Sequence, residues 1–144
     1  SHPEFDVNLA KEQSEKNPVY YLQYAHARIA SIVRFAESQR TLDKSHDVRS
    51  HRLDLLKEPS EVALAKLLLE FPEWVQGTCL AYEPHRLTTY LHDVANAFHR
   101  FYHECRVVIP ELDLSRARLA LCLAAKIVLA NGFKILGISA PEQM

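Results

Sequence analysis

Apolar residues recur at three- and four-residue intervals along most of the chain, which is the period of helices with one buried side. The first such stretch contains Leu22, Ala25, Ile29, Val33 and Ala36. Asn17 and Pro18 precede it as an N-cap side chain and a first-turn proline, whose missing N–H costs nothing at that position. We therefore expect a helix from Pro18 to about Arg40.

Three prolines divide the rest of the chain into further helical segments. Ser60 is predicted to cap a helix over 61–71, and Pro72 to lie in the first turn of a short helix in which Gly77 marks a weak point. Pro84 opens a long segment over 85–108, and Pro110 breaks the pattern. The most apolar segment covers 115–132, with Asn131-Gly132 as its expected stop. The polar segment 41–54 predicts an exposed connection.

These segments predict an all-α fold, a single bundle of about five to six helices over residues 17–144, preceded by an extended lead-in over 1–16. Only three of the 144 residues are glycine, and 48% are hydrophobic, which favours one helical domain with a sizeable core. The expected core includes Leu22, Ile29, Val33, Leu91, Val94, Phe98, Phe101, Leu121, Ile127 and Leu129.

The charge and the cysteines exclude some classes of protein. The formal net charge of −1 gives no overall basic field for non-specific duplex binding, although it leaves room for a small site that takes one RNA loop. Cys79, Cys105 and Cys122 are odd in number and widely spaced, which favours reduced thiols and a cytoplasmic location. We find no signal peptide, and no apolar run approaches the roughly 20 residues that span a bilayer, so no membrane partner is expected.

Metal or catalytic chemistry has little support in the sequence. His99 and His103 have the four-residue spacing of a metal-binding pair, but no H-E-x-x-H motif surrounds them and no third ligand follows. A pair of partly exposed histidines beside Arg100 and Arg106 is therefore the favoured interpretation, with a metalloenzyme as the alternative. Cys105 falls on the apolar side of its helix and is expected in the core. We expect no catalytic residues, no metal and no cofactor in this chain.

Two patches combine aromatic and basic side chains. Tyr21, Tyr24 and Arg28 follow one flank of the first helix at positions i, i+3 and i+7, and Tyr102 stands among His99, Arg100, His103 and Arg106. Such residues can form the rim that closes a core. They can also offer stacking faces to unstacked bases and a guanidinium to a base edge or phosphate. Spacing alone leaves both interpretations open.

Longer segments resemble the anticodon-binding domain of arginyl-tRNA synthetases. The segment NPVYYLQYAHARIASI is similar to the start of that domain, and four later segments follow in the order of the family: KEPSEVALAKLLLEFPEWV, EPHRLTTYLHDVANAFHRFYHECRVV, RARLALCLAAKIVLANGFKILGI and APEQM. The lead-in FDVNLAKEQSEKNPV resembles the junction that follows the catalytic domain. The family is named for a D-A-L-R signature, and this chain carries SRARLA in its place.

The resemblance implies an α-helical bundle that binds the anticodon stem-loop of arginine tRNA. It implies contacts to the anticodon loop from Tyr21, Tyr24, Arg28, Tyr102 and Met144, so the stripe on the first helix is better interpreted as a platform for bases. His99 and Arg106 are further candidates. Relatives can carry an aromatic residue at position 106, so a stacking role is not implied for Arg106.

The resemblance also implies chemistry that this chain does not contain. The family's ATP site lies in a separate catalytic domain with His-x-Gly-His-like and Lys-Met-Ser-Lys-Ser-like motifs, and neither motif occurs here. ATP, with magnesium, and the ligation of arginine to tRNA are therefore implied for a parent enzyme, with that domain in the same polypeptide and a monomer in solution. The alternatives are a helical protein-interaction module and a stand-alone relative that delivers arginine tRNA to a modification enzyme.

Overall fold

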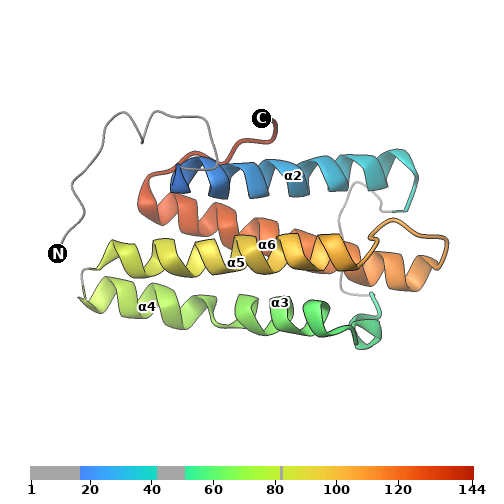
Figure 1. Ribbon diagram of the computed structural model, residues 1–144, viewed down its shortest axis with the longest axis horizontal. Coiled ribbons are helices and arrows are strands. Elements are labelled where there is room, and N and C mark those ends of the chain that lie inside the picture. The colour runs from blue at the N-terminus through green and yellow to red at the C-terminus, as the bar shows by residue number, and fades with distance from the viewer. Residues whose placement is uncertain (1–16, 42–50, 82) are drawn as a thin grey trace.

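A computed structural model describes residues 17–41, 51–81 and 83–144, and the lead-in expected over 1–16 lies outside them. The described residues contain no strand, and they form one 3-10 turn and five α-helices, which confirms the all-α prediction. The elements are α2 (Pro18–Ser38), η1 (Leu53–Leu55), α3 (Pro59–Leu69), α4 (Phe71–Ala81), α5 (Pro84–Glu104) and α6 (Leu112–Leu136). Figure 1 shows α3 and α4 following one another along one side of the bundle, α2 along the opposite side, and α5 and α6 between them.

The core lies where α5 and α6 meet the other helices, and its largest fully buried side chains include Tyr90, Phe98, Phe101 and Phe133. Nine of the ten expected core residues are buried, but Ile127 is 59% exposed, so that prediction was wrong. On α6, Ile127 shares its side with Asn131 and Lys134, at i+4 and i+7, and both of these are also exposed. The high overall apolarity of α6 concealed which side faces solvent.

The helix starts follow capping rules, with one correction. Asn17 caps α2 as expected, because its side-chain oxygen accepts a hydrogen bond of 3.0 Å from the backbone N–H of Val19. Ser60, expected to cap α3, lies instead inside the first turn and is buried. Glu58 is the N-cap, because a proline follows it at the first helical position and Glu61 completes a capping box.

The end of α6 also differs from the expectation. The helix does not stop at Asn131-Gly132 but continues to Leu136, and Gly137 ends it in the left-handed conformation with a φ of 73°. Gly132 serves another purpose, because a Cβ atom at this position would lie 2.6 Å from both methyl carbons of the buried Leu91. The missing side chain lets α6 approach α5 closely.

Alanine substitutions at two helical glycines should have opposite effects on stability. Gly132→Ala is expected to lower the free energy of unfolding by about 1–2 kcal/mol, because the cost of overpacking exceeds the gain in helix propensity. Gly77→Ala in α4, where nothing lies within 4 Å of the new Cβ, should raise it by roughly 0.5–1 kcal/mol. Chemical denaturation of both variants checks this. A stabilised Gly132→Ala variant would contradict the close approach of α6 to α5.

By length and composition α6 could cross a membrane, with a mean hydropathy of 1.8 over its most apolar window. This finding corrects the expectation that no apolar run approaches the length needed to span a bilayer. Lys126 and Lys134 interrupt the apolar residues of α6, but the segment remains apolar on average. The packing explains the same apolar character. α6 contacts α2, α3 and α5 and contributes twelve buried residues to the bundle.

Candidate nucleic-acid interface

The two aromatic-basic patches found in the sequence form one surface, which we call the α2–α5 cluster. It consists of Tyr21, Tyr24 and Arg28 from α2 and His99 and Tyr102 from α5. The Arg28 guanidinium carbon lies 4.8 Å from the centroid of the Tyr102 ring and 6.0 Å from that of Tyr24. The Nη1 atom of Arg28 also donates a hydrogen bond of 3.3 Å to the Tyr24 hydroxyl. Arg28 therefore joins the aromatic rings of the two helices.

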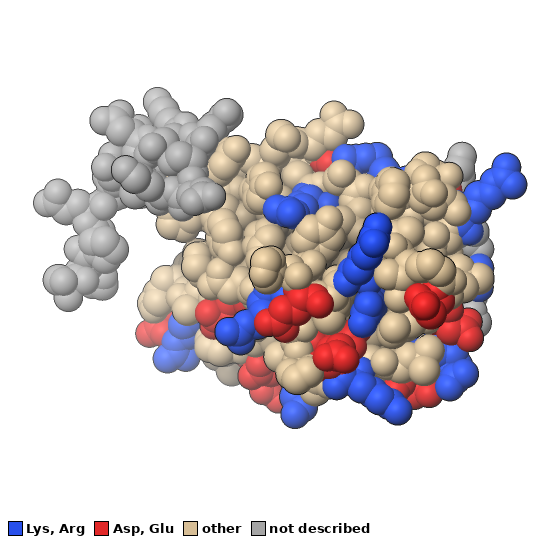
Figure 2. Space-filling model, turned by 45° about the vertical axis from the view of Figure 1, so that its right-hand side comes forward, with Lys and Arg blue, Asp and Glu red and all other residues tan. Residues whose placement is uncertain are grey.

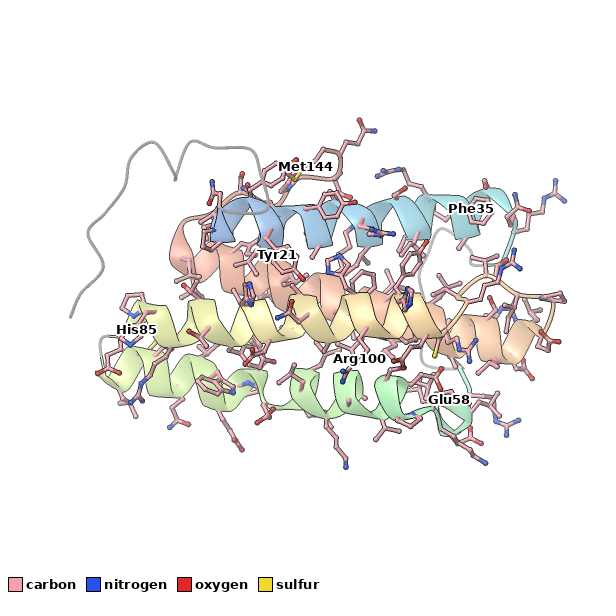
Figure 3. All side chains as sticks on the ribbon, in the orientation of Figure 1. Tyr21, Phe35, Glu58, His85, Arg100 and Met144 are labelled. Atoms are coloured by element: carbon pink, nitrogen blue, oxygen red, sulfur yellow. The ribbon has the colours of Figure 1, made fainter. Side chains whose placement is uncertain are left out.

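The two tyrosines of α2 have different surroundings. Tyr21 is half-buried, and its hydroxyl donates a hydrogen bond of 2.7 Å to the Asn96 side-chain oxygen and lies 3.1 Å from Nδ1 of His99. Its ring lies 5.0 Å from the His92 ring, between centroids. Tyr24 is 39% exposed and stacks one face against His99 at a centroid distance of 6.2 Å. Tyr24 is thus the more accessible stacking face, and Tyr21 is held in place by its polar neighbours. Figure 3 shows Tyr21 between α2 and α5.

The surroundings of His99 disfavour its protonated form. Burial lowers its pKa below the ordinary value, and the charge of Arg28 lowers it further. Its Nε2 atom is buried and has no hydrogen-bond partner among the described residues. A proton on Nε2 would therefore find no acceptor there and would stand close to a guanidinium.

The lowered pKa of His99 predicts how stability depends on pH. Because the folded state resists protonation, the unfolded state takes up a proton more readily below about pH 6.5, and stability falls as the pH falls through that value. The variant His99→Gln should lose less stability between pH 7 and pH 5.5 than the wild type. Denaturant unfolding at both pH values checks this, and NMR should find that the His99 ring titrates below pH 6.5. An ordinary or raised pKa would contradict the prediction.

The C-terminal residues lie along α2 and bring Met144 to the cluster. Gln23 donates to the backbone oxygen of Ser139, and Arg34 donates to that of Glu142 at 3.1 Å. A groove of about 390 Å³ lies between α2 and this tail. It is lined by Tyr24, Ala27, Arg28, Ser31, Arg34, Gln143 and Met144. The structure therefore places Met144 with Tyr24 and Arg28, two of the three α2 residues that the resemblance grouped with it.

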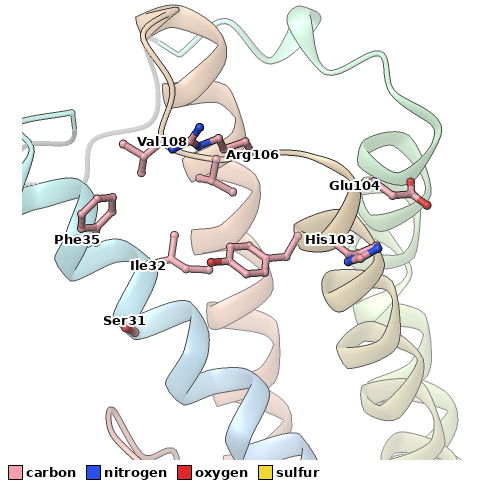
Figure 4. A pocket seen from close by; sticks show the side chains of 9 residues that line it. Ser31, Ile32, Phe35, His103, Glu104, Arg106 and Val108 are labelled. Carbon is pink, nitrogen blue, oxygen red and sulfur yellow. The ribbon is translucent and has the colours of Figure 1, made fainter.

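A second groove, of about 760 Å³, continues along α2 past the Arg28–Tyr102 contact. Figure 4 shows Ile32 and Phe35 on one side of it and Arg106 and Val108, from the α5–α6 loop, on another. It is lined by Ser31, Ile32, Phe35, Tyr102, His103, Glu104, Arg106, Val107 and Val108. Ser31 lines both grooves, so they are neighbours on one surface.

Phe35 was missed in the sequence, although it extends the stripe of Tyr21, Tyr24 and Arg28 by a further seven residues. Its side chain is 53% exposed and lines the larger groove. Arg100 does not join the surface, since Figure 3 shows it on the side of α5 that faces α3.

The charges on this surface are mainly basic. On the face shown in Figure 2, acidic side chains gather mostly over the lower part, where α3 and α4 lie, and the upper part carries Lys and Arg among uncharged residues. The charged residues of α2 are Arg28, Arg34 and Glu37. Over the described ranges, no group of three or more His, Cys, Asp or Glu residues could hold a metal ion.

Comparisons with known proteins agree on one family. The model of the DALR anticodon binding domain matches residues 22–144. The arginine–tRNA ligases of Chlorobaculum tepidum and Salinibacter ruber are each 51% identical over the whole chain, which spans about a quarter of their length. The arginyl-tRNA synthetase structure of Thermus thermophilus matches 97% of the chain and 23% of its own length, with a TM-score of 0.76 and 33% identity. A Campylobacter jejuni structure with the same enzyme name covers the whole chain and 30% of its own length, with a TM-score of 0.84 and 29% identity. The chain therefore belongs to the DALR anticodon-binding domain family of arginine–tRNA ligases.

Proposed function

We propose that the α2–α5 cluster, with its two grooves, binds the anticodon stem-loop of arginine tRNA. The observation that carries the proposal is the convergence of the Tyr24 ring, the Arg28 guanidinium and the Met144 side chain at one groove. Single-stranded RNA loops are bound by stacking splayed bases on aromatic rings and by pairing base edges or phosphates with Arg. This surface offers both kinds of group on two rigid helices.

The geometry of Arg28 suits the recognition of one particular base. Every arginine codon has guanine in the middle, so the middle base of the anticodon is cytosine, whose Watson–Crick edge presents two acceptors, O2 and N3. A guanidinium presents several N–H donors in a planar fork. Packing against Tyr102 orients the Arg28 fork before RNA arrives, and the exposed face of Tyr24 is available to stack a base, at about 1–3 kcal/mol.

This binding would serve a larger enzyme. The named relatives are arginine–tRNA ligases about four times the length of this chain, and we propose the same setting here: a cytoplasmic protein whose catalytic domain, in the same polypeptide, uses ATP with magnesium to join arginine to the bound tRNA. The role of the present chain is then to hold the anticodon while the other end of the tRNA reacts.

A binding titration tests the proposal directly. The chain is titrated with arginine tRNA and with the same tRNA carrying a changed middle anticodon base. We expect the unaltered tRNA to bind more tightly, by about 1–3 kcal/mol for one well-paired base. Equal affinity for both tRNAs would favour a protein-interaction module. Tight, base-selective binding by a protein whose natural gene encodes no catalytic domain would favour the stand-alone tRNA-binding relative.

The chain alone should not charge tRNA. Incubation with ATP, arginine and arginine tRNA should give no aminoacylated product, because the sequence has neither of the family's ATP-binding motifs. Acid-gel separation of charged and uncharged tRNA checks this, with a full-length arginine–tRNA ligase as the positive control. Aminoacylation activity that persists through rigorous purification would contradict the proposal that the chemistry belongs to a separate catalytic domain.

A further inference from the structure

The loop between α5 and α6 forms one wall of the larger groove, and its backbone is anchored from behind by α6. The Ser115 hydroxyl donates a hydrogen bond of 2.7 Å to the backbone oxygen of Val107 and accepts one of 3.4 Å from the N–H of Ile109. Ser115 is fully buried. Arg106, by contrast, has an exposed side chain that lines the groove. The loop therefore has a fixed inner side and a free basic side chain on its outer side.

Arg118 of α6 makes a second and more polar anchor. Its Nε donates a hydrogen bond of 2.7 Å to Oε2 of Glu61, and its Nη1 donates one of 2.8 Å to the backbone oxygen of Arg106. Glu61 is 1% exposed, and its other oxygen accepts the backbone N–H of Glu58 in the capping box of α3. A single guanidinium thus connects the start of α3 to the backbone of the groove wall.

These contacts use the shape of the guanidinium as well as its charge. The Nε and Nη1 donors point in fixed, different directions within one plane, so Arg118 can serve the carboxylate and the carbonyl at once. A lysine ammonium could pair with Glu61 but would place its donors at a single point. Substitution by lysine therefore keeps the charge that the buried carboxylate needs and releases the Arg106 carbonyl.

We propose that Arg118 is a positioning residue for RNA binding: it fixes the backbone of Arg106 and so the direction in which the Arg106 side chain enters the groove. This inference rests on the proposed function, because it assumes that RNA occupies the groove. In this arrangement Arg106 contacts the RNA, and Arg118 acts only through Arg106.

A double-mutant cycle tests the proposal, with Arg118→Lys, Arg106→Ala and the double variant. Affinity for arginine tRNA is measured per folded molecule, together with the unfolding free energy of each variant. Arg118→Lys should weaken binding by about 3- to 30-fold, which lies within the range for coupled residues in one hydrogen-bonded network. In the Arg106→Ala background, the same substitution should change the affinity less than about twofold. Additive effects, or an unchanged affinity in Arg118→Lys, would overturn the proposal.

Arg116 offers a matched control two residues earlier on the same helix. Its Nε donates a hydrogen bond of 3.1 Å to the backbone oxygen of Thr41, which follows α2 and does not line either groove. Arg116→Lys removes the same kind of contact and should leave RNA affinity unchanged. An equal loss of affinity in Arg116→Lys would mean that loosening α6 anywhere weakens binding, and the specific role of Arg118 would fail.

The variant Glu61→Gln tests positioning without altering Arg118, even if Arg118→Lys does not fold. Its carbonyl oxygen can still accept from the Glu58 N–H, but its NH2 group then faces the Nε–H of Arg118, so the guanidinium loses its carboxylate partner. We expect weaker RNA binding per folded molecule in Glu61→Gln and no such weakening in the Arg106→Ala background, and an unchanged affinity in Glu61→Gln would overturn the proposal. Failure of the proposed function itself would be recognised separately, because the wild type would then bind arginine tRNA and the middle-base mutant equally.

Discussion

Replacing Phe98 with alanine should lower the free energy of unfolding by about 3–5 kcal/mol, the usual cost of truncating a buried phenylalanine. Phe98 is fully buried in the C-terminal half of α5. Its ring centroid lies 6.3 Å from that of Phe101 and 6.0 Å from that of Tyr102, which is stacked on it. A cavity at this position removes contacts from two rings at once.

Denaturant unfolding of Phe98→Ala and of Ile127→Ala forms the test. Ile127 is also a large apolar residue on a core helix, but it is 59% exposed, so its truncation should change stability by less than about 0.5 kcal/mol. Phe98→Leu, which keeps most of the volume, should lie between them. A loss below about 1 kcal/mol in Phe98→Ala would contradict the full burial of this ring in the core.

Replacing Arg28 with alanine should reduce both the affinity for arginine tRNA and the preference for cytosine at the middle anticodon position. If the guanidinium pairs with the base edge, the loss is about 1–3 kcal/mol for the natural anticodon and much smaller for a changed middle base. Arg28 is half-buried, and it packs over Tyr102 at 4.8 Å, so its orientation is set before binding. That preorganisation favours a base contact over a flexible phosphate contact.

Two other variants distinguish the possible roles of Arg28. Arg28→Lys keeps the positive charge and loses the planar fork, so it should retain RNA affinity only if the partner of Arg28 is a phosphate. In that case Arg28→Ala should also make RNA affinity depend less steeply on salt concentration. Tyr24→Ala should cost about 1–3 kcal/mol with little regard to which base stacks. If Tyr24→Ala lowers only thermal stability and Arg28→Ala leaves the affinity unaltered, α2 is not part of the RNA site.

Periodicity predicted the elements well where one residue decides the outcome locally. Asn17 with Pro18, and Pro84, mark helix starts because a cap or a missing N–H acts within a single turn. Periodicity predicted less where packing between helices decides. Gly132 looked like a stop, but its role is to accommodate Leu91 of another helix. Ile127 looked like a core residue because α6 is apolar on several sides, and only the neighbours of that helix determine which side is covered.

The candidate site was likewise predictable where neighbours lie on one helix and unpredictable where they lie on different helices. The stripe on α2 could be identified from spacing, since i, i+3 and i+7 positions share a helix side in any fold. The union of Arg28 with Tyr102 could not, because these residues are 74 positions apart and meet only through the crossing of α2 and α5. Arg118 appears in the sequence as one more charged residue in an apolar helix. The role of its guanidinium becomes clear only in the structure, where it donates hydrogen bonds to both Glu61 and the Arg106 backbone oxygen.

The pairing of α2 with the tail has a consequence for synthesis on the ribosome. Gln23 and Ser139 are 116 residues apart, and His26 reaches the backbone oxygen of Pro141 across 115. Such contacts form only after the intervening helices have left the exit tunnel, so α2, which is translated before the other described helices, waits longest for its partners. Until α5 and α6 have emerged, the apolar side of α2, with Leu22 and Ile29, lacks the helices that cover it in the folded domain, and exposed apolar surface of this kind on a nascent chain is what chaperones protect.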